Sequence, residues 1–137
     1  MKWHTLIFIT LTWALPVLGA GTHKYYEKDY QHAWCSANSG QAEVILADKA
    51  RVDCVTKTHA VEFDFAKKWG ESIGQALYYA AMTGKKAGVV LIMENGEKDN
   101  KYLERLMKVA DLHGITVWVM TDADMLNPNC KIFNKIH

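Results

Sequence analysis

The sequence predicts a single α/β domain in which a mixed central sheet is flanked by helices, with its elements in the order αβββαβαβ. Three observations predict this class: apolar residues recur at helical spacing, three short β-type segments are joined by brief turns, and two continuous apolar runs alternate with helices. A meander followed by strands with crossover helices gives a mixed sheet covered by helices. The chain has 137 residues, half of them hydrophobic, which suits one domain.

The first half of the domain is predicted to be a helix followed by an antiparallel meander. Residues 24–34 read as a helix because Tyr26, Tyr30, Ala33 and Trp34 recur at helical spacing. The composition of residues 35–40 indicates a loop. The expected strands, joined by short turns, are residues 41–46, 50–56 and 59–65.

The second half is predicted to alternate helices with buried strands. Helices are expected at residues 66–83 and 99–113, each closed by a glycine. The continuous apolar runs at 87–93 and 115–120 are typical of strands buried on both faces. From about residue 121 the chain is expected to form an irregular tail, with a turn at 127–129.

Residues 1–20 have the layout of a secretory signal peptide. A short basic start precedes the apolar run 5–18, and cleavage is expected after the small residues Gly19 and Ala20. An uncleaved membrane anchor is the alternative, but the run is shorter than the roughly 20 residues of a spanning helix. The mature domain, residues 21–137, is therefore expected to be exported, periplasmic or secreted, without a stable membrane span after cleavage.

The exported domain is expected to be close to neutral. Loss of Lys2 with residues 1–20 leaves 15 of the 16 basic residues, against 15 acidic ones. Nucleic-acid binders usually carry a basic excess. Any basic surface must therefore be local, and the candidates are Lys67, Lys68, Lys85 and Lys86.

Three cysteines allow at most one disulfide within the chain. Export permits disulfides, and the pair Cys35–Cys54 is favoured because Cys130 lies in the irregular tail. Three reduced, packed cysteines are the alternative. A zinc site is not expected, since no two cysteines have ligand spacing.

Strand alternation predicts a cluster of carboxylates. Glu62 and Asp64 share one face of the strand at 59–65, and the opposite face is apolar. A hairpin brings Asp53 of the preceding strand close to them. Neighbouring carboxylates repel one another unless they bind cations or shift their pKa values, and an oxygen-rich site suits Mg²⁺, Mn²⁺ or Ca²⁺. The alternative is a solvated polar face with Arg51 as a partner.

The helix expected at residues 66–83 carries a polar row. On a helical wheel Lys68, Gln75 and Tyr79 fall in line, opposite an apolar stripe. Because the helix begins directly after the acidic strand, this row is expected to border the carboxylates. An ordinary amphipathic surface helix is the alternative.

Three short motifs follow one another along the chain: Asp53, then Glu62-Phe-Asp64, then Gln75-Ala-Leu-Tyr-Tyr79. Their order resembles that of the RecB-type branch of the PD-(D/E)XK, or restriction endonuclease-like, superfamily. The stretch 34–94 also resembles small bacterial proteins assigned to that superfamily. The resemblance implies a restriction endonuclease-like core. It further implies a nuclease that uses Mg²⁺ or Mn²⁺ and acts on nucleic acid, by default DNA.

The resemblance also implies a set of metal ligands and a catalytic lysine. Asp53 and Glu62 match the acids of the family that bind the metal, Asp64 is a further ligand, and Glu43 matches an earlier family glutamate more loosely. Where the family has Glu-x-Lys, this sequence has Asp64 in the lysine position. Lys68 is therefore the expected catalytic lysine.

The helix motif of the family implies a nucleic-acid contact. Gln75 and Tyr79 match residues that help to position nucleic acid and the active site, and Lys67 is a further basic candidate. The implied reaction is metal-assisted hydrolysis of a phosphodiester. Two alternatives stay open: a catalytically inactive nuclease-fold module that binds or interacts, because the lysine is replaced, and an exported structural domain with a fortuitous carboxylate cluster.

Overall fold

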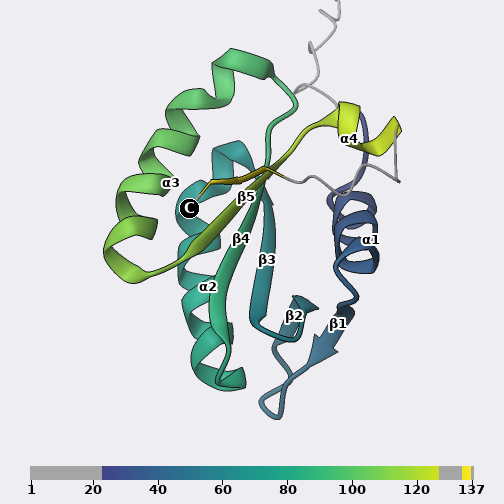
Figure 1. Cartoon of the computed structure of the whole chain (residues 1–137), viewed down its shortest axis with the longest axis vertical. Coiled ribbons are helices and arrows are strands. Elements are labelled where there is room, and N and C mark those ends of the chain that lie inside the picture. The colour runs from purple at the N-terminus through teal and green to yellow at the C-terminus, as the bar shows by residue number, and fades with distance from the viewer. Residues whose placement is uncertain (1–22, 127–133, 137) are drawn as a thin grey trace, which may run out of the picture.

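The computed structural model describes residues 23–126 and 134–136 and has an α/β architecture (Figure 1). Its mixed sheet has six strands whose spatial order follows the chain. The strands are β1 (Gln41–Ile45), β2 (Arg51–Val55), β3 (His59–Phe65), β4 (Lys86–Ile92), β5 (Thr116–Met120) and β6 (Asn134–Ile136). The helices are α1 (Glu27–Ala37), η1 (Ala66–Lys68), α2 (Trp69–Thr83), η2 (Gly96–Asp99), α3 (Asn100–His113) and α4 (Asp122–Leu126).

The sheet combines an antiparallel meander with parallel strands. β1, β2 and β3 pair antiparallel, whereas β3, β4 and β5 run parallel to one another. α2 links β3 to β4, and α3 links β4 to β5, because parallel neighbours need a crossover connection. The predicted order of elements and the mixed sheet are therefore present in the structure.

The chain beyond residue 121 is more regular than predicted. α4 begins there, and Thr121 caps it by donating its backbone N–H to Asp124 Oδ2 at 2.7 Å. β6 then pairs antiparallel with β5, with Val117 opposite Ile136. This pairing satisfies backbone groups that would otherwise be exposed along the edge of β5. Short elements of this kind carry little periodicity, so composition alone indicated a loop.

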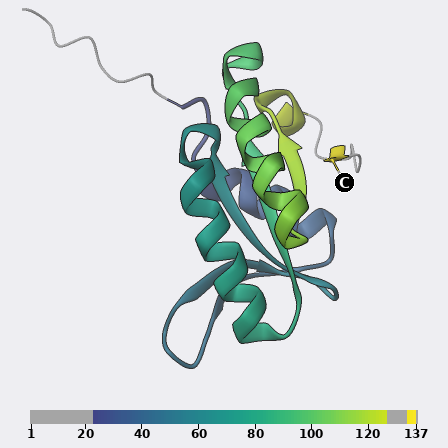
Figure 2. The ribbon, with the colours of Figure 1, turned by 90° about the vertical axis from the view of Figure 1, so that its left-hand side faces the viewer.

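Helices cover both faces of the sheet. α1 packs on one face, and α2 and α3 lie together on the other, as Figure 2 shows from the side of α2 and α3. Alternate residues of β4 divide between the two layers: Val89 and Leu91 pack under α2 and α3, and Val90 and Ile92 pack under α1. The apolar stripe predicted on the long helix, including Trp69, is part of the α2–α3 layer.

The long helix predicted at residues 66–83 is divided. Ala66–Lys68 forms a 3₁₀ turn, and the α-helix begins at Trp69. It ends at Gly84, whose φ of 68° suits glycine. Because a 3₁₀ turn has three residues per turn instead of 3.6, the wheel that aligned Lys68 with Gln75 does not describe Lys68.

A disulfide joins α1 to the sheet. Cys35 and Cys54 form it, with their Cα atoms 5.8 Å apart, and this is the pair that the sequence favoured. Cys35 lies within α1, which begins three residues later than predicted and continues through Ala37, so the expected loop starts later. Gly40 passes so close that a Cβ there would lie 2.5 Å from Cys54 Sγ.

Several expectations concern residues outside the described part of the chain, namely the signal peptide at 1–20, the turn at 127–129 and Cys130. Across residues 23–126 and 134–136, none of the helices has both the length and the apolar character needed to cross a bilayer.

Candidate active site

The pairing between β2 and β3 does not extend to Asp53. The two strands pair only through Cys54 with Val61 and through Val55 with Ala60. One residue further along, the Phe63 backbone N–H donates to Asp53 Oδ2 at 2.9 Å. The carboxylate therefore occupies the place of a strand carbonyl, and this bond holds the Asp53 side chain in the opening between the strands.

Glu62 and Asp64 are buried on the α2 side of β3. Their residues are 5% and 3% exposed, and Asp53 beside them is half-buried. Val61 and Phe63, on the opposite face, pack in the layer under α1. The alternation predicted for this strand is correct, but the alternative of a solvated polar face is wrong, because these carboxyl groups are withdrawn from water.

Burial and mutual repulsion raise the pKa values of these acids. Burial first, and then the charges of Asp53 and Asp64, raise the pKa of Glu62 to about 10. Burial also raises the pKa of Asp53, against a hydrogen bond from Phe63. Burial and then the charge of Glu27 raise the pKa of Asp64 to about 7. Asp53 and Glu62 share a hydrogen bond, which requires a proton on one of them.

One oxygen of this pair lacks a partner. Glu62 Oε2 is buried and receives no hydrogen bond from the residues that the structure describes. An unsatisfied buried acceptor costs about 1–3 kcal/mol. An electropositive ligand at this oxygen would remove that cost, and no side chain on the described elements supplies one.

Helix α1 contributes two residues that the sequence analysis missed, Glu27 and Gln31. Burial, followed by the charge of Asp53, raises the pKa of Glu27. Gln31 is 3% exposed, and its Nε2 donates to the Asp53 carbonyl oxygen at 2.6 Å and to Glu43 Oε1 at 2.8 Å. The two are one helical turn apart, which could have placed them on one face, but nothing local indicated that this face meets Asp53.

Glu43 is engaged by other side chains. It has φ of 59° within β1, a conformation that is uncommon for residues other than glycine. Its register neighbours Ala42 and Val44 pair with Cys54 and Val52, so Glu43 stands opposite Asp53. Its carboxylate accepts a hydrogen bond from Gln31 Nε2 and forms an ion pair with Arg51 at 2.9 Å. Glu43 thus lies beside Asp53, held by these two partners.

The candidate basic residues fall into two groups. Lys68 Nζ lies 3.8 Å from Asp64 Oδ1, whereas the neighbouring Lys67 is exposed. Lys86 pairs with His59 at the other end of β3, and Lys85 Nζ donates to the Lys57 carbonyl oxygen at 2.9 Å. Of these four lysines, Lys68 is the one with a contact to the carboxylates.

The Gln–Tyr pair of α2 is divided between the surface and the interior. Gln75 is exposed, and its Nε2 donates to Tyr79 Oη at 3.5 Å. Tyr79 is 6% exposed and packs on Val52 and Ala60. Burial raises the pKa of Tyr79, and the charges of Glu62 and Asp53 add to that rise. The tyrosine therefore lies within electrostatic reach of Glu62 and Asp53.

The acids do not form a complete cage for a metal ion. Within residues 23–126 and 134–136, no three of the His, Cys, Asp and Glu side chains are grouped so that they could hold one. Mg²⁺ is nonetheless usually bound by one or two carboxylates together with water and substrate phosphates. The adjacent Asp53 and Glu62 carboxyls, with the unpaired Glu62 Oε2, fit this smaller donor set.

Comparisons with protein-family models, with curated proteins and with solved structures found no match to this chain.

Proposed function

We propose that the protein is a metal-dependent nuclease that hydrolyses phosphodiester bonds, by default in DNA, through the acids at the opening between β2 and β3. The observation that carries this proposal is the pair of half-buried Asp53 and buried Glu62, with Glu62 Oε2 left without a hydrogen-bond partner in the described chain. Buried carboxyl groups that repel one another are a costly arrangement, and such perturbed groups cluster at functional sites.

A divalent cation would relieve the repulsion that a proton now relieves. Asp53 and Glu62 are the residues that would hold Mg²⁺ or Mn²⁺, since hard cations prefer carboxylate oxygens. Such an ion activates water and neutralises charge on a phosphate. The bond from Phe63 N–H to Asp53 Oδ2 fixes one ligand in advance, which reduces the cost of assembling the site.

Other residues would tune this pair. Glu27 and Asp64 add negative charge close to the ligands, since each raises the pKa of Glu62. Lys68, on the 3₁₀ turn after β3, would approach a phosphate or a water as a point charge. Tyr79 and Gln75 would support the carboxylates from α2, and Lys67 remains available for a nucleic-acid phosphate.

The arrangement of the elements supports a restriction endonuclease-like core. The chain begins with α1, continues through the antiparallel meander β1–β3 and returns by α2 to β4, parallel to β3. The acids lie on the second and third strands of this series, Asp53 on β2 and Glu62 on β3. Fold alone does not imply activity, so the proposal rests on the site.

Export of the mature domain is part of the same proposal. The Cys35–Cys54 disulfide supports it, because disulfides persist mainly in oxidising compartments such as the periplasm and the extracellular space. The signal peptide proposed at residues 1–20 would direct the chain there.

The test is cleavage of plasmid and single-stranded DNA by the mature protein with Mg²⁺ or Mn²⁺. We expect EDTA to abolish cleavage, and Glu62→Gln to reduce it at least about 100-fold, because a neutral amide is a poor metal ligand. Glu104→Gln, an exposed acid on α3, is the matched control and should cleave normally. Cleavage that survives both EDTA and Glu62→Gln would remove the proposal.

A non-catalytic nuclease-fold module that binds or interacts is the second candidate. Two observations favour it: Asp64 stands where the family has its lysine, and no three-ligand group is present among the described residues. Calorimetry separates the two candidates. A folded protein that binds neither Mg²⁺ nor Mn²⁺ and cleaves no DNA would be such a module.

A further inference from the structure

A pocket of about 740 Å³ opens between the start of α1 and the end of β3. The segment 23–27 forms most of its wall, and Asp29 and Phe65 complete it. Its lining includes the rings of His23, Tyr25, Tyr26 and Phe65. A pocket with this concentration of aromatic side chains suits a flat, partly apolar ligand.

The pocket adjoins the proposed active site. Glu27 is part of its wall, and the charge of this residue raises the pKa values of Glu62 and Asp64. Phe65 follows Asp64 directly on β3. Glu27 therefore links the two sites, and a substrate that occupied both would place one group in the pocket and a phosphate at Asp53 and Glu62.

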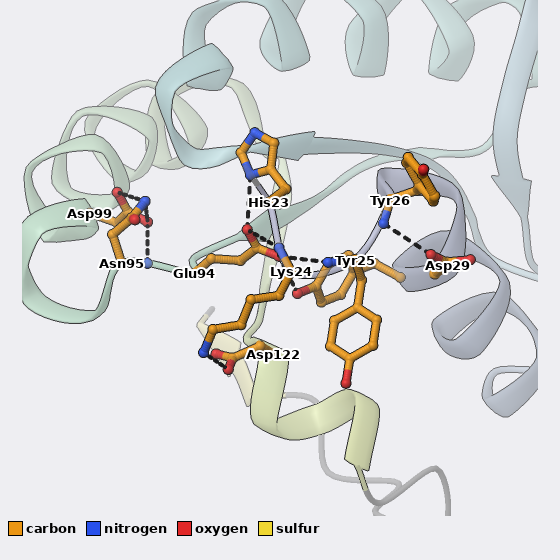
Figure 3. Close-up of polar contacts among 10 residues, drawn as sticks. His23, Lys24, Tyr25, Tyr26, Asp29, Glu94, Asn95, Asp99 and Asp122 are labelled. Carbon is orange, nitrogen blue, oxygen red and sulfur yellow. Dashed lines mark hydrogen bonds and ion pairs between the residues drawn. The ribbon is translucent and has the colours of Figure 1, made fainter. Parts of the chain in front are cut away.

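Glu94, two residues after the end of β4, holds the aromatic wall in place. Its side chain is 6% exposed and accepts hydrogen bonds from His23 Nδ1 at 2.8 Å and from Tyr30 Oη at 2.7 Å. The Lys24 backbone N–H donates to it as well, at 3.2 Å, so that the segment is anchored in several places (Figure 3). The wall is thus formed before a ligand arrives, which lowers the entropic cost of binding.

Two aromatic rings of the pocket wall differ in whether another ring of the protein already stacks on them. The His23 ring stacks on Phe65, with centroids 3.5 Å apart and an interplanar angle of 16°. Tyr26, which precedes the first residue of α1, is 83% exposed. In Figure 3 both His23 and Tyr26 extend to the same side of the segment. Tyr26 therefore presents a free aromatic face beside the pocket.

The charges of the wall indicate which part of a nucleotide would enter. Glu27 and Asp29 place carboxylates there, and these repel a phosphate but accept hydrogen bonds from the amino groups of a base. Lys24, the cation of the wall, forms an ion pair with Asp122. The near-neutral charge of the exported domain also provides little for a long duplex backbone.

We propose that this pocket binds an unpaired nucleobase, with Tyr26 as its stacking platform, so that the protein acts on single-stranded nucleic acid or on unpaired ends. The inference rests on the proposed nuclease function and names its substrate class. A base paired within a duplex is stacked between its neighbours and presents no free face to a protein ring, whereas an unpaired base does.

Equilibrium binding in EDTA tests this without cleavage. Fluorescence anisotropy compares a single-stranded DNA, the same sequence as a blunt duplex, and a strand of equal length made of abasic sites. We expect the single strand to bind about tenfold or more tightly than the duplex, and Tyr26→Ala to weaken its binding about 5- to 100-fold. Tyr78→Ala is the matched control, because Tyr78 is an exposed tyrosine on α2 that contacts Asp48 of the β1–β2 turn.

The abasic strand separates a base contact from a phosphate contact. It should bind wild type weakly, and Tyr26→Ala should not change that binding. Equal affinity for the duplex and the single strand would overturn the inference, as would an unchanged affinity of Tyr26→Ala for the single strand. Parallel cleavage assays with Mn²⁺ distinguish the two proposals: Tyr26-dependent binding without cleavage would retain the pocket and remove the nuclease, and Tyr26-independent duplex cleavage would do the reverse.

Discussion

Lys68 is the residue that distinguishes the proposed nuclease from the proposed binding module. Its Nζ lies 3.8 Å from Asp64 Oδ1, and its side chain is 56% exposed, whereas that of Asp64 is 4% exposed. An ion pair whose lysine is this exposed contributes little to stability. A point charge at the edge of buried carboxylates can contribute much more to a reaction in which negative charge develops.

We therefore expect Lys68→Ala to separate activity from folding. Cleavage should fall about 100-fold, a typical effect of removing one charge-stabilising group, while the thermal unfolding midpoint stays within about 2 °C because the Lys68 side chain is more than half exposed. Lys67→Ala is the matched control, since Lys67 is exposed on the same 3₁₀ turn without this contact. An equal loss in both variants would indicate general electrostatic attraction of the substrate.

At the scale of elements, α1 carries part of the site to the sheet. Glu27 and Gln31 lie on this helix, and Cys35, one further turn along, ties it covalently to β2 beside Asp53. The disulfide spans a sequence separation of 19 residues. Closing a loop of about 15 residues stabilises a fold by about 3 kcal/mol in the chain-entropy description.

Replacing both cysteines should therefore weaken folding and the site together. We expect Cys35→Ala/Cys54→Ala to lose about 3 kcal/mol of unfolding free energy in urea denaturation. Mn²⁺ affinity in calorimetry should fall as well, because Gln31 then holds the Asp53 backbone on a less constrained helix. Cys130→Ala, which leaves this disulfide in place, is the control. Unchanged stability of the double variant would show that packing of α1 suffices.

At the scale of the whole molecule, the buried acids set how stability depends on pH. The folded-state pKa values of Asp64, about 7, and Glu62, about 10, lie above the unfolded values near 4. The contribution of these two groups to folding stability is greatest at pH values below their unfolded-state pKa values. It is lost as pH rises through their folded-state pKa values. Glu94, Asp122 and Asp48 have lowered pKa values. Their contributions to folding stability are therefore lost only as pH falls below the unfolded pKa values.

The metal-free protein should therefore become less stable between pH 5 and pH 8. Each unit of pKa shift that is left uncompensated corresponds to about 1.4 kcal/mol, so we expect the midpoint of thermal unfolding to fall by about 5 °C or more. Mn²⁺ should reverse the fall at pH 8 and have little effect at pH 5, because it binds the ionised carboxylates. A midpoint that rises across this range, or a Mn²⁺ effect independent of pH, would contradict the account.

Much of the fold follows from periodicity. The bounds of β3 agree with the prediction at 59–65, and its alternation placed Glu62 and Asp64 on one face. The apolar runs that became β4 and β5 were placed within one residue at each end. These features depend on neighbouring positions in the chain, which a sequence displays directly.

The sequence by itself determined the strands β1 to β5, the apolar faces of the long helices and the acids that share β3. Only the tertiary structure decided that β2 and β3 separate at Asp53, that Gln31 of α1 reaches its carbonyl and that a 3₁₀ turn brings Lys68 to Asp64. It also decided that Tyr26 stays exposed beside a pocket. The reason is physical: periodicity is a local property, whereas these contacts depend on where distant segments pack, which small differences in burial and hydrogen bonding decide.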